Sequence, residues 1–483
     1  MNEDDARRVL LVRAVEIEDS AEALLTREDR QAATAAGLAD GFDPSRNGDE
    51  RFLAQRAAFA FGRLTTRFPL IEQACRASQW PRWLGWAVPG VALLLGVATN
   101  EVGNGKRLNL IAFPLIGMLA WNALVYLWLI VSALRRRRPS RVGAWIARWA
   151  GPRIDEHQPL GRALARFGRD WIGAAGRLTT ARVSRSFHLG AAAFAIGVVA
   201  NLYLRALGVE YRAGWESTFL QAPTVHALLG IALGPASAVT GIALPTPEHL
   251  AGLRWSEGPG EVAAPWIHLY AATAALFIVA PRLLLAMASG GNVARLKRGV
   301  PVPGREDFHV RRLLRAAQGG AAEVRVLPYG FTPPDTTRRT LAELLTAALG
   351  DGTRTQVDAP IPYGGEEEWL ARARLTDGLD HLVILFNLGS TPEAENHGAL
   401  VAGVQKLLAG RGTALSIVLD EAAFRERSGG GDRLDVRRQA WERMLATTGE
   451  HPFAADLSQA RDANLVRRLE SALVRSPTLG LKR

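Results

Sequence analysis

The pattern of apolar and polar positions divides the chain into long apolar runs and charged, amphipathic stretches. Two runs, 187–207 and 266–287, are each long enough to cross a bilayer core of roughly 30 Å at about 1.5 Å per helical residue. Two more runs, 83–99 and 108–134, are separated by so few residues that only a tight external turn fits between them. The pattern therefore predicts an α-helical membrane bundle of four transmembrane helices.

Three residues inside these runs carry specific expectations. Pro114 frees a backbone carbonyl and predicts a kink, and Asn122 requires a polar partner within the bundle. Arg282 lies near the end of its run, where we expect its long side chain to reach the lipid headgroups.

The segment 208–265, between the last two spans, is only partly apolar. It contains the run 225–244, which we expect to be broken into two pieces of about ten residues. The breaks are Gly230, Gly234, Pro235 and Gly241. Such pieces fit either a re-entrant hairpin beside a water-filled path or an external helical cap. A fifth crossing is disfavoured because it would export the basic C-terminal half.

Charge sets the expected orientation. The formal net charge is +11, and residues 135–185 hold 13 Arg against three acidic residues, whereas 208–265 holds two Arg against five Glu. Because positive residues favour the cytoplasmic face, we place both termini in the cytoplasm and 208–265 outside. Tryptophans interleave with the arginines of 140–185, a pattern that can stack nucleic-acid bases. Between two cytoplasmic helix ends, however, it favours anionic lipid headgroups, so no nucleic-acid partner is predicted.

Beyond residue 287 the pattern changes to short strands that alternate with helices. The strand-like runs are 323–329, 355–361, 381–387 and 414–419, and the helical runs are 336–349, 366–374, 393–408 and 435–447. This alternation predicts a cytosolic α/β domain with a mainly parallel sheet.

The expected organisation follows from these patterns. It comprises an N-terminal cytosolic helical region (1–82), a transmembrane hairpin (83–134, with spans 83–99 and 108–134), basic cytosolic linker helices (135–186), a transmembrane pair (187–287, with spans 187–207 and 266–287), a basic linker (288–320), the α/β domain (321–458), and a C-terminal helix and tail (459–483).

The loop after the first strand of the α/β domain lacks the chemistry of a phosphate-binding loop. Residues 328–337 read Pro-Tyr-Gly-Phe-Thr-Pro-Pro-Asp-Thr-Thr, with prolines in place of N–H donors and no lysine. Gly103-Asn-Gly-Lys106 lacks the upstream glycine and the following Ser or Thr. The nine histidines show no metal-ligand spacing and the one cysteine is Cys75. We therefore predict a protein that is not an enzyme and uses no cofactor or metal.

Two turns at the ends of predicted strands are candidates for a ligand or partner site. In Asn387-Leu-Gly-Ser-Thr391, the two hydroxyls either cap the next helix or offer donors to an anion. Asp420 with Glu421 either caps a helix or forms a carboxylate pair for metal or acid–base chemistry. The candidate residues are Asn387, Gly389, Ser390, Thr391 and Asp420.

The stretch Tyr211-Arg-Ala-Gly-Trp-Glu-Ser-Thr-Phe-Leu220, with the basic segment before it and the α/β half after it, resembles an uncharacterised family of bacterial inner-membrane proteins. That family is a domain of unknown function typically encoded beside a GTPase, and the resemblance covers about 51–456. It implies a GTPase that docks on the α/β domain. The motif residues are Tyr211, Arg212, Gly214, Trp215, Glu216, Ser217 and Thr218. Arg212 and Glu216, four residues apart, can pair on a helix.

These observations support one leading function and two alternatives. The leading expectation is a multi-pass protein of the bacterial inner membrane that anchors or regulates a cytosolic GTPase. The first alternative is a homo-oligomeric channel or transporter built around 225–244. The second is an enzyme that uses the sheet edge around Asn387 and Asp420.

Overall fold

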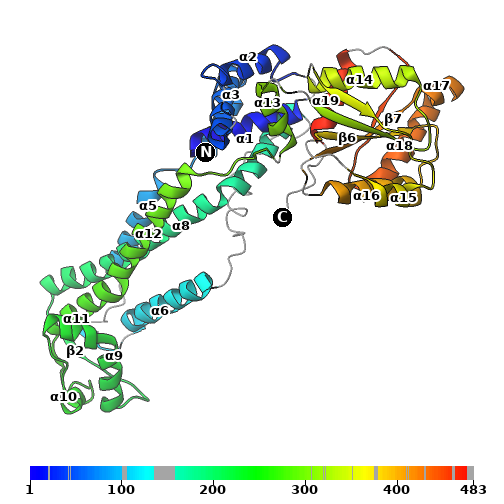
Figure 1. Ribbon diagram of the computed structural model, residues 1–483. Coiled ribbons are helices and arrows are strands. Elements are labelled where there is room, and N and C mark those ends of the chain that lie inside the picture. Colours follow the sequence, from blue (N-terminus) through cyan, green and yellow to red (C-terminus); the bar gives the residue numbers. More distant parts are fainter. Residues whose placement is uncertain are drawn as a thin grey trace. The chain divides into compact units, whose positions relative to one another are not determined.

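A computed structural model describes most of the chain (Figure 1). The described residues are 1–19, 22–41, 43, 45–99, 106–111, 113–134, 158–305, 307–318, 320, 322–350, 352–374, 379–409, 411, 413–428, 431–459 and 463–475. Several expectations lie outside them: most of the turn 100–107, the tetra-arginine 135–138, the aromatic-basic residues 140–157 and the C-terminal tail. The chain divides into two compact units. Unit 1 comprises Met1–Ser78, Gly151–Trp171 and Pro301–Arg483, and unit 2 comprises Gln79–Ala150 and Ile172–Val300.

The N-terminal part of unit 1 is helical. Its helices are α1 (Glu3–Glu18), α2 (Arg27–Gly37), α3 (Arg46–Arg67) and α4 (Pro69–Ala77). Asn2, Thr26 and Ser45 each begin a helix by accepting a backbone N–H from three residues ahead, as N-cap side chains do. Apolar side chains at helical spacing, such as Leu11 and Leu64, are fully buried between these helices.

The C-terminal part of unit 1 contains a five-stranded parallel sheet, which confirms the predicted parallel-strand fold. Its strands are β4 (Glu323–Pro328), β5 (Arg354–Val357), β6 (His381–Asn387), β7 (Ala414–Asp420) and β8 (Phe453–Ala455), in the order β5-β4-β6-β7-β8. The strand expected over 355–361 is shorter, because beyond Val357 only Ile361 bridges back to Tyr329. β8 was not expected, since three residues are too few to show a pattern.

Helices cover both faces of this sheet (Figure 1). One face packs against α14 (Asp335–Leu349) and α19 (Ala463–Arg475), and the other against α16 (Ala399–Leu408) and α18 (Asp432–Ala446). The remaining elements are α13 (Phe308–Gln318), α15 (Glu366–Arg372), η2 (Ala394–Gly398) and α17 (Ala422–Ser428). The two-sided cover explains why β6 and β7 read as nearly continuous apolar runs rather than alternating ones.

We expect the stability of the protein to fall with acidification because of His381. This side chain is buried in β6 against the Ser416 hydroxyl (2.9 Å), and burial lowers its pKa to about 3. In the unfolded chain the same histidine binds a proton near pH 6.5. The contribution of neutral His381 to the free energy of unfolding is therefore fully present above about pH 6.5. Below that pH it is lost by up to about 1.4 kcal/mol per pH unit. Denaturant unfolding at pH 7 and pH 5.5 measures this loss. In His381→Gln the loss should be smaller, and an unchanged pH dependence would contradict this origin.

Unit 2 is built from long apolar helices. They are α5 (Leu84–Ala98), α6 (Phe113–Leu134), α8 (Pro159–Gly208, which begins in unit 1), α9 (Ala222–Thr240), α11 (Ala264–Ala274) and α12 (Ala280–Arg298), with the π-helical turn η1 (Ala275–Val279) joining the last two. Among the described residues, α8, α9 and the stretch Ala264–Arg298 are long and apolar enough to cross a membrane, while Leu84–Ala98 and Gly117–Ser132 are shorter apolar helices. These lengths are compatible with a membrane protein.

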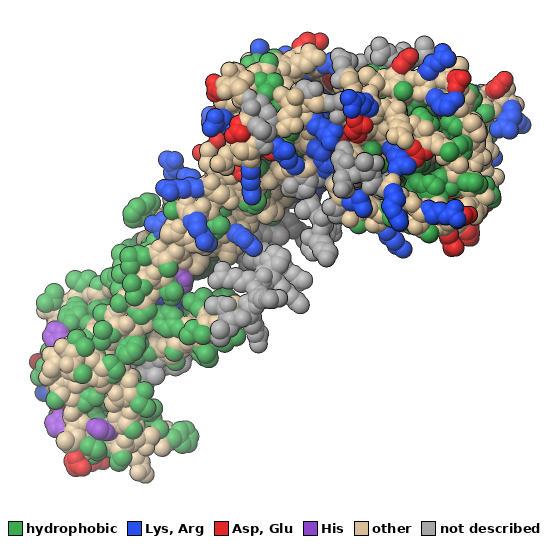
Figure 2. All heavy atoms as spheres, in the orientation of Figure 1, with side chains coloured by type: hydrophobic (Ala, Val, Ile, Leu, Met, Phe, Trp, Pro, Cys, Tyr) green, Lys and Arg blue, Asp and Glu red, His purple; other side chains and the backbone are tan. Residues whose placement is uncertain are grey.

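The surface of unit 2 is rich in large apolar side chains (Figure 2). Examples are Trp86 (85% exposed), Trp121 (66%) and Leu284 (62%). Of the exposed large apolar residues in the described chain, all but Leu70, Tyr363 and Val436 belong to this unit. Monomeric soluble proteins rarely expose apolar surface on this scale, so the surface fits contact with lipid.

The span expected over 108–134 does not begin at Leu108. Residues Arg107–Asn109 form β1, which pairs with β2 (Arg212–Gly214), which in turn pairs with β3 (Glu261–Val262). Leu108 is buried in the cluster around this small sheet, and the helix begins only at Phe113. Backbone pairing with a distant strand therefore removes these residues from the helix.

The expected division of 225–244 into two short pieces is also wrong. Residues Ala222–Thr240 form one helix, α9, with Pro235 inside it, and the helix ends at Gly241 in the left-handed conformation (φ +73). Val225, Leu229, Leu233 and Ala236 pack along one face against the cluster around the small sheet. This buried stripe at helical spacing holds the helix together across its glycines.

Arg282 does not extend to the surface as expected. Its side chain is 6% exposed and its Nη2 donates to Asn122 Oδ1 (2.7 Å), so the polar partner expected for Asn122 is this arginine. The two side chains bind each other inside unit 2, because a buried polar group needs a hydrogen-bond partner.

Candidate functional site

The structure brings Asn387 and Asp420 together at the carboxyl edge of the parallel sheet. β6 and β7 are in register with these residues opposite each other, and the N–H of Leu388 donates to the carbonyl of Asp420 (2.9 Å). Asn387 Oδ1 accepts the N–H of Gly389 (2.8 Å) and so shapes the turn. Two candidate residues from separate strands are thus neighbours, as the parallel arrangement predicts.

Ser390 and Thr391 do not cap a helix. The next helical turn begins at Ala394, its N-cap residue is Glu393, and no side chain caps it. Pro392 intervenes, and both hydroxyl residues are exposed. The capping interpretation is therefore wrong, while a role as donors to an anion stays a prediction.

Gly389 allows a cation to approach this turn. A Cβ atom there would lie 2.5 Å from Nη2 of Arg427, a residue of α17. The edge therefore combines one guanidinium with the two exposed hydroxyls of the turn, a combination that suits an acidic or phosphorylated partner surface.

Asp420 and Glu421 do not form a carboxylate pair for a metal. Asp420 accepts the N–H of Ala422 (3.0 Å), the first residue of α17, and its other oxygen accepts the Thr337 hydroxyl (3.2 Å). Burial raises the pKa of Asp420 despite these hydrogen bonds. Glu421 is fully buried and its two oxygens accept from Arg438 at 2.5 and 2.8 Å. Both carboxyl groups are occupied by structural contacts.

A cluster of aromatic and acidic residues at the same edge was missed from the sequence. β4 lies between β5 and β6, so the next two strands along the chain are placed on opposite sides of it. Open α/β sheets bind ligands at the carboxyl edge beside such a switch in strand order. Near it, Tyr329 donates its hydroxyl to Glu366 and Tyr363 donates to Glu393. His397 packs edge-on with its ring 5.0 Å from that of Tyr329.

No short motif signals this cluster, because its members come from three separate segments. Burial lowers the pKa of His397, and the Tyr363 hydroxyl holds the pKa of Glu393 below its ordinary value. Within the described ranges no three His, Cys, Asp or Glu side chains form a group that could hold a metal.

The motif 211–220 is largely a packing element of the small sheet. Trp215 is fully buried and donates its indole N–H to the carbonyl of Leu250 (2.7 Å), and Tyr211 is buried in the same cluster. A Cβ atom at Gly214 would lie 2.7 Å from the carbonyl oxygen of Leu253, so only glycine fits. The Ser217 hydroxyl accepts the N–H of Leu220 (3.0 Å) and shapes the following turn.

The helical pairing suggested for Arg212 and Glu216 is wrong. Arg212 lies on β2, where side chains alternate between faces, and its nearest carboxylate is Glu210 (3.7 Å). Glu216 and Thr218 are exposed. Together with Arg212 and Phe219, which are also exposed, they form the part of the motif that lies at the surface.

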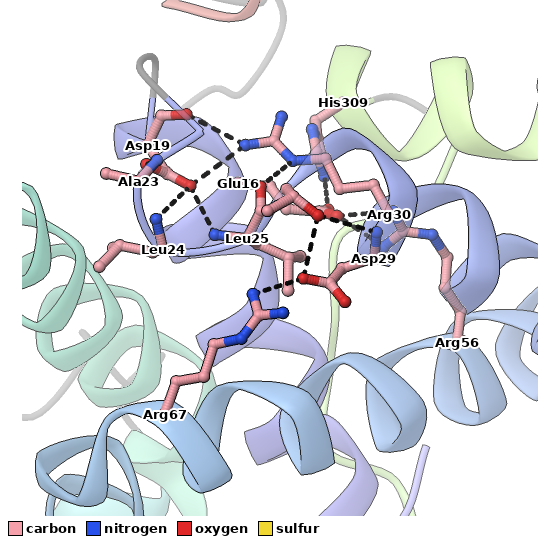
Figure 3. A network of polar contacts seen from close by, with 11 residues as sticks. Glu16, Asp19, Ala23, Leu24, Leu25, Asp29, Arg30, Arg56, Arg67 and His309 are labelled. Atoms are coloured by element: carbon pink, nitrogen blue, oxygen red, sulfur yellow. Dashed lines mark hydrogen bonds and ion pairs between the residues drawn. The ribbon is translucent and has the colours of Figure 1, made fainter.

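A second polar network, also missed from the sequence, joins three distant segments inside unit 1 (Figure 3). Glu16 of α1 accepts from Arg56 of α3 at 2.6 and 3.0 Å and lies 2.9 Å from Nε2 of His309 in α13. Burial alone would raise the pKa of Glu16, but Arg56 and His309 hold it well below its ordinary value.

Further ion pairs reinforce the same junction. Arg13 of α1 contacts both Asp307 (2.5 Å) and Asp170 of α8 (3.0 Å), and Glu18 contacts Arg166 (3.1 Å). The N-terminal helices, the start of α8 and the segment after α12 therefore fold as one body. Arginines that read as helix flanks in the sequence are structural partners here.

The comparisons with known proteins find no matching curated protein and no matching solved structure. A family model does match part of the chain, from residues before α8 through β2, β3 and α12 to β5. Residues 147–355 match the family described as protein of unknown function (DUF2868), so this part of the chain is similar to an uncharacterised family.

Proposed function

We propose that this protein is a four-span protein of the bacterial inner membrane that anchors or regulates a cytosolic GTPase through its α/β domain. The observation that carries the proposal is the ion-pair network of unit 1, which joins the segments before, between and after the apolar helices. The GTPase partner itself rests on the resemblance of the motif 211–220.

The network supports an even number of membrane crossings. The chain leaves unit 1 after residue 78 and returns by 151, then leaves after 171 and returns by 301. Because the flanking segments bind one another directly, they lie on one side of any membrane. Each of the two segments between them, 79–150 and 172–300, must then cross the bilayer an even number of times.

This even number supports four crossings. The first segment contains α5 and α6, which make one pair of crossings. The second segment contains most of α8, together with α9 and the stretch Ala264–Arg298, so two of these three helical stretches cross. α9 is the one left out, because it packs against the small sheet and α11 as a cap. The parity argument thus favours the cap over a crossing.

The α/β domain fits partner binding. Its carboxyl edge offers Arg427, Ser390 and Thr391 on the surface, while Glu366 and Glu421 are engaged by neighbouring side chains. A GTPase that docks there would leave nucleotide hydrolysis to the partner.

Membrane topology tests the first half of the proposal. In a Cys75→Ser background, single cysteines replace Gly62, Val436 and Phe219, and intact cells are treated with a membrane-impermeant maleimide. We expect labelling of the cysteine at Phe219, which is 92% exposed beside the small sheet, and no labelling at the other two until the cells are opened. Labelling at Val436 in intact cells would overturn the topology.

Capture of the GTPase tests the second half. The detergent-solubilised full chain should retain the GTPase encoded beside it, in the presence of either GDP or a non-hydrolysable GTP analogue. A charge and size change at the edge, Thr391→Arg, should weaken capture about tenfold or more, which corresponds to about 1.4 kcal/mol. Arg354→Glu, on an exposed residue at the opposite end of the sheet, should not. Failure of the wild-type protein to retain the GTPase in either nucleotide state would reject the docking proposal.

A further inference from the structure

A buried arginine in unit 2 organises a polar cluster among the apolar helices. Arg282 of α12 donates from Nε (2.9 Å) and Nη2 (2.7 Å) to Asn122 Oδ1 of α6, and its Nη1 lies 3.2 Å from Nδ1 of His188 in α8. Its guanidinium carbon also lies 5.0 Å from the ring centre of Tyr126. We call these four residues the Arg282 cluster.

The local sequence explains why the cluster forms here. Pro281 has no N–H, so it cannot donate to the carbonyl four residues earlier, that of Phe277. The chain forms the π-helical turn η1 at this point, and Tyr126 donates its hydroxyl to the Phe277 carbonyl (3.0 Å). This bond holds the Tyr126 ring against Arg282. Single π-helical turns within helices are frequent at functional sites.

The cluster carries a positive charge that no described residue neutralises. The structure shows no ion pair between Arg282 and a carboxylate in the described ranges, although the side chain is only 6% exposed. A buried cation among apolar helices costs several kcal/mol unless an opposite charge or water compensates it. The Tyr126 ring compensates only part of this cost.

The hydrogen-bonding groups of the cluster are also unbalanced. Asn122 Oδ1 accepts twice from Arg282, and the Asn122 amide donates to the carbonyl of Met118 (2.9 Å). With Nδ1 of His188 accepting from Arg282, its Nε2 carries the proton of the neutral ring. The Tyr126 hydroxyl oxygen is a further hydrogen-bond partner of Arg282 and takes one of its two remaining Nη N–H groups. One Nη N–H of Arg282 and the Nε2–H of His188 are then left without an acceptor among the described residues. What remains is a positive charge and surplus donors.

We propose that the Arg282 cluster binds a small inorganic anion of the size of chloride. Surplus hydrogen-bond donors around a single positive charge favour an anion, because an anion accepts hydrogen bonds and also neutralises the charge. A cation or a neutral ligand would leave the positive charge uncompensated. The ligand is small because Arg282, Asn122 and His188 already contact one another. A lipid phosphate is the less suitable source, because Arg282 points into the helices. The inference rests on unit 2 alone and does not depend on the docking of a GTPase.

Anion-dependent stability of the full-length protein tests this site. The protein in a neutral detergent is melted in sodium gluconate with increasing replacement by sodium chloride at constant ionic strength. We expect the melting temperature to rise by a few degrees and to saturate, as binding to the folded state requires. The rise should be absent in Arg282→Gln. It should persist in Arg298→Gln, which removes an exposed arginine from the end of the same helix.

Three results would overturn the proposal. They are a wild-type melting temperature that is equal in chloride and gluconate, a chloride response that survives in Arg282→Gln, or stabilisation by phosphatidylglycerol in place of chloride, which would assign the site to a lipid phosphate. If Arg282→Gln does not fold, a crystal of the wild-type protein grown with bromide tests the site instead, by anomalous diffraction. An anomalous bromide peak within hydrogen-bond distance of Arg282 supports the site, and its absence there rejects it.

Discussion

Replacing Arg56 by methionine is expected to destabilise unit 1 by about 3–5 kcal/mol, the usual effect of removing one partner from a buried ion pair. Arg56 and Glu16 are both almost fully buried, and two hydrogen bonds join them. Without the guanidinium, His309 is the partner that remains to Glu16 among the described residues, and burial penalises the charge of Glu16. Denaturant unfolding of the purified protein and protease sensitivity of the N-terminal helices measure the loss.

The matched control is Arg76→Met. Arg76 also pairs with a glutamate, Glu72, but both side chains are exposed, so the expected change is below about 1 kcal/mol. The double variant Glu16→Met with Arg56→Met should recover much of the stability, since replacing both partners by apolar groups removes the unpaired charge. Equal effects of Arg56→Met and Arg76→Met would show that burial of the pair contributes nothing.

Adding one methyl group at Gly197 is expected to destabilise unit 2 by about 1–3 kcal/mol, the range for overpacking. A Cβ atom at Gly197 would lie 2.3 Å from the carbonyl oxygen of Leu93, and one at Gly96 would lie 2.3 Å from that of Phe194. α5 and α8 therefore touch through their backbones at two glycines, as membrane helices often do. Because backbone atoms cannot rotate away, Gly197→Ala must push the helices apart. Thermal unfolding in detergent measures the effect.

Gly173→Ala, on the same helix, provides the control of opposite sign. Nothing lies within 4 Å of a Cβ atom at Gly173, so alanine there should stabilise the helix by up to about 1 kcal/mol through its better propensity. If Gly197→Ala also stabilised the protein, the close contact of α5 with α8 would be refuted.

The parts of the fold that follow from local pattern were predicted well. The strand over 381–387 matches β6 residue for residue, and the helix expected over 336–349 differs from α14 by one residue. β6 is a nearly continuous apolar run and α14 repeats its apolar residues at helical spacing, so their own sequence specifies them. Asn387 lies beside Asp420 because β6 and β7 are adjacent parallel strands in register, and the structure supplies that adjacency.

The errors arose where distant segments decide the local structure. Leu108 reads as the start of an apolar helix, but pairing with β2 makes it part of a strand. Glycines read as breaks in 225–244, but a buried stripe keeps α9 continuous. Arg282 reads as a flank, but Asn122 and His188 from two other helices draw it inward. In each case contact with another segment of the chain outweighs the local preference.

The sequence alone was sufficient to indicate apolar helices that fit a membrane and a separate parallel α/β fold. The signals were the length of the apolar runs, the distribution of arginines and the alternation of strands with helices, which are all properties of neighbouring residues. The tertiary structure alone decided which polar side chains meet: Glu16 with Arg56 and His309, and Arg282 with Asn122. Such pairings depend on packing between segments that no local pattern connects. The physical reason is that burial makes an unpaired charge expensive, so the fold must bring its partner from wherever the chain provides one.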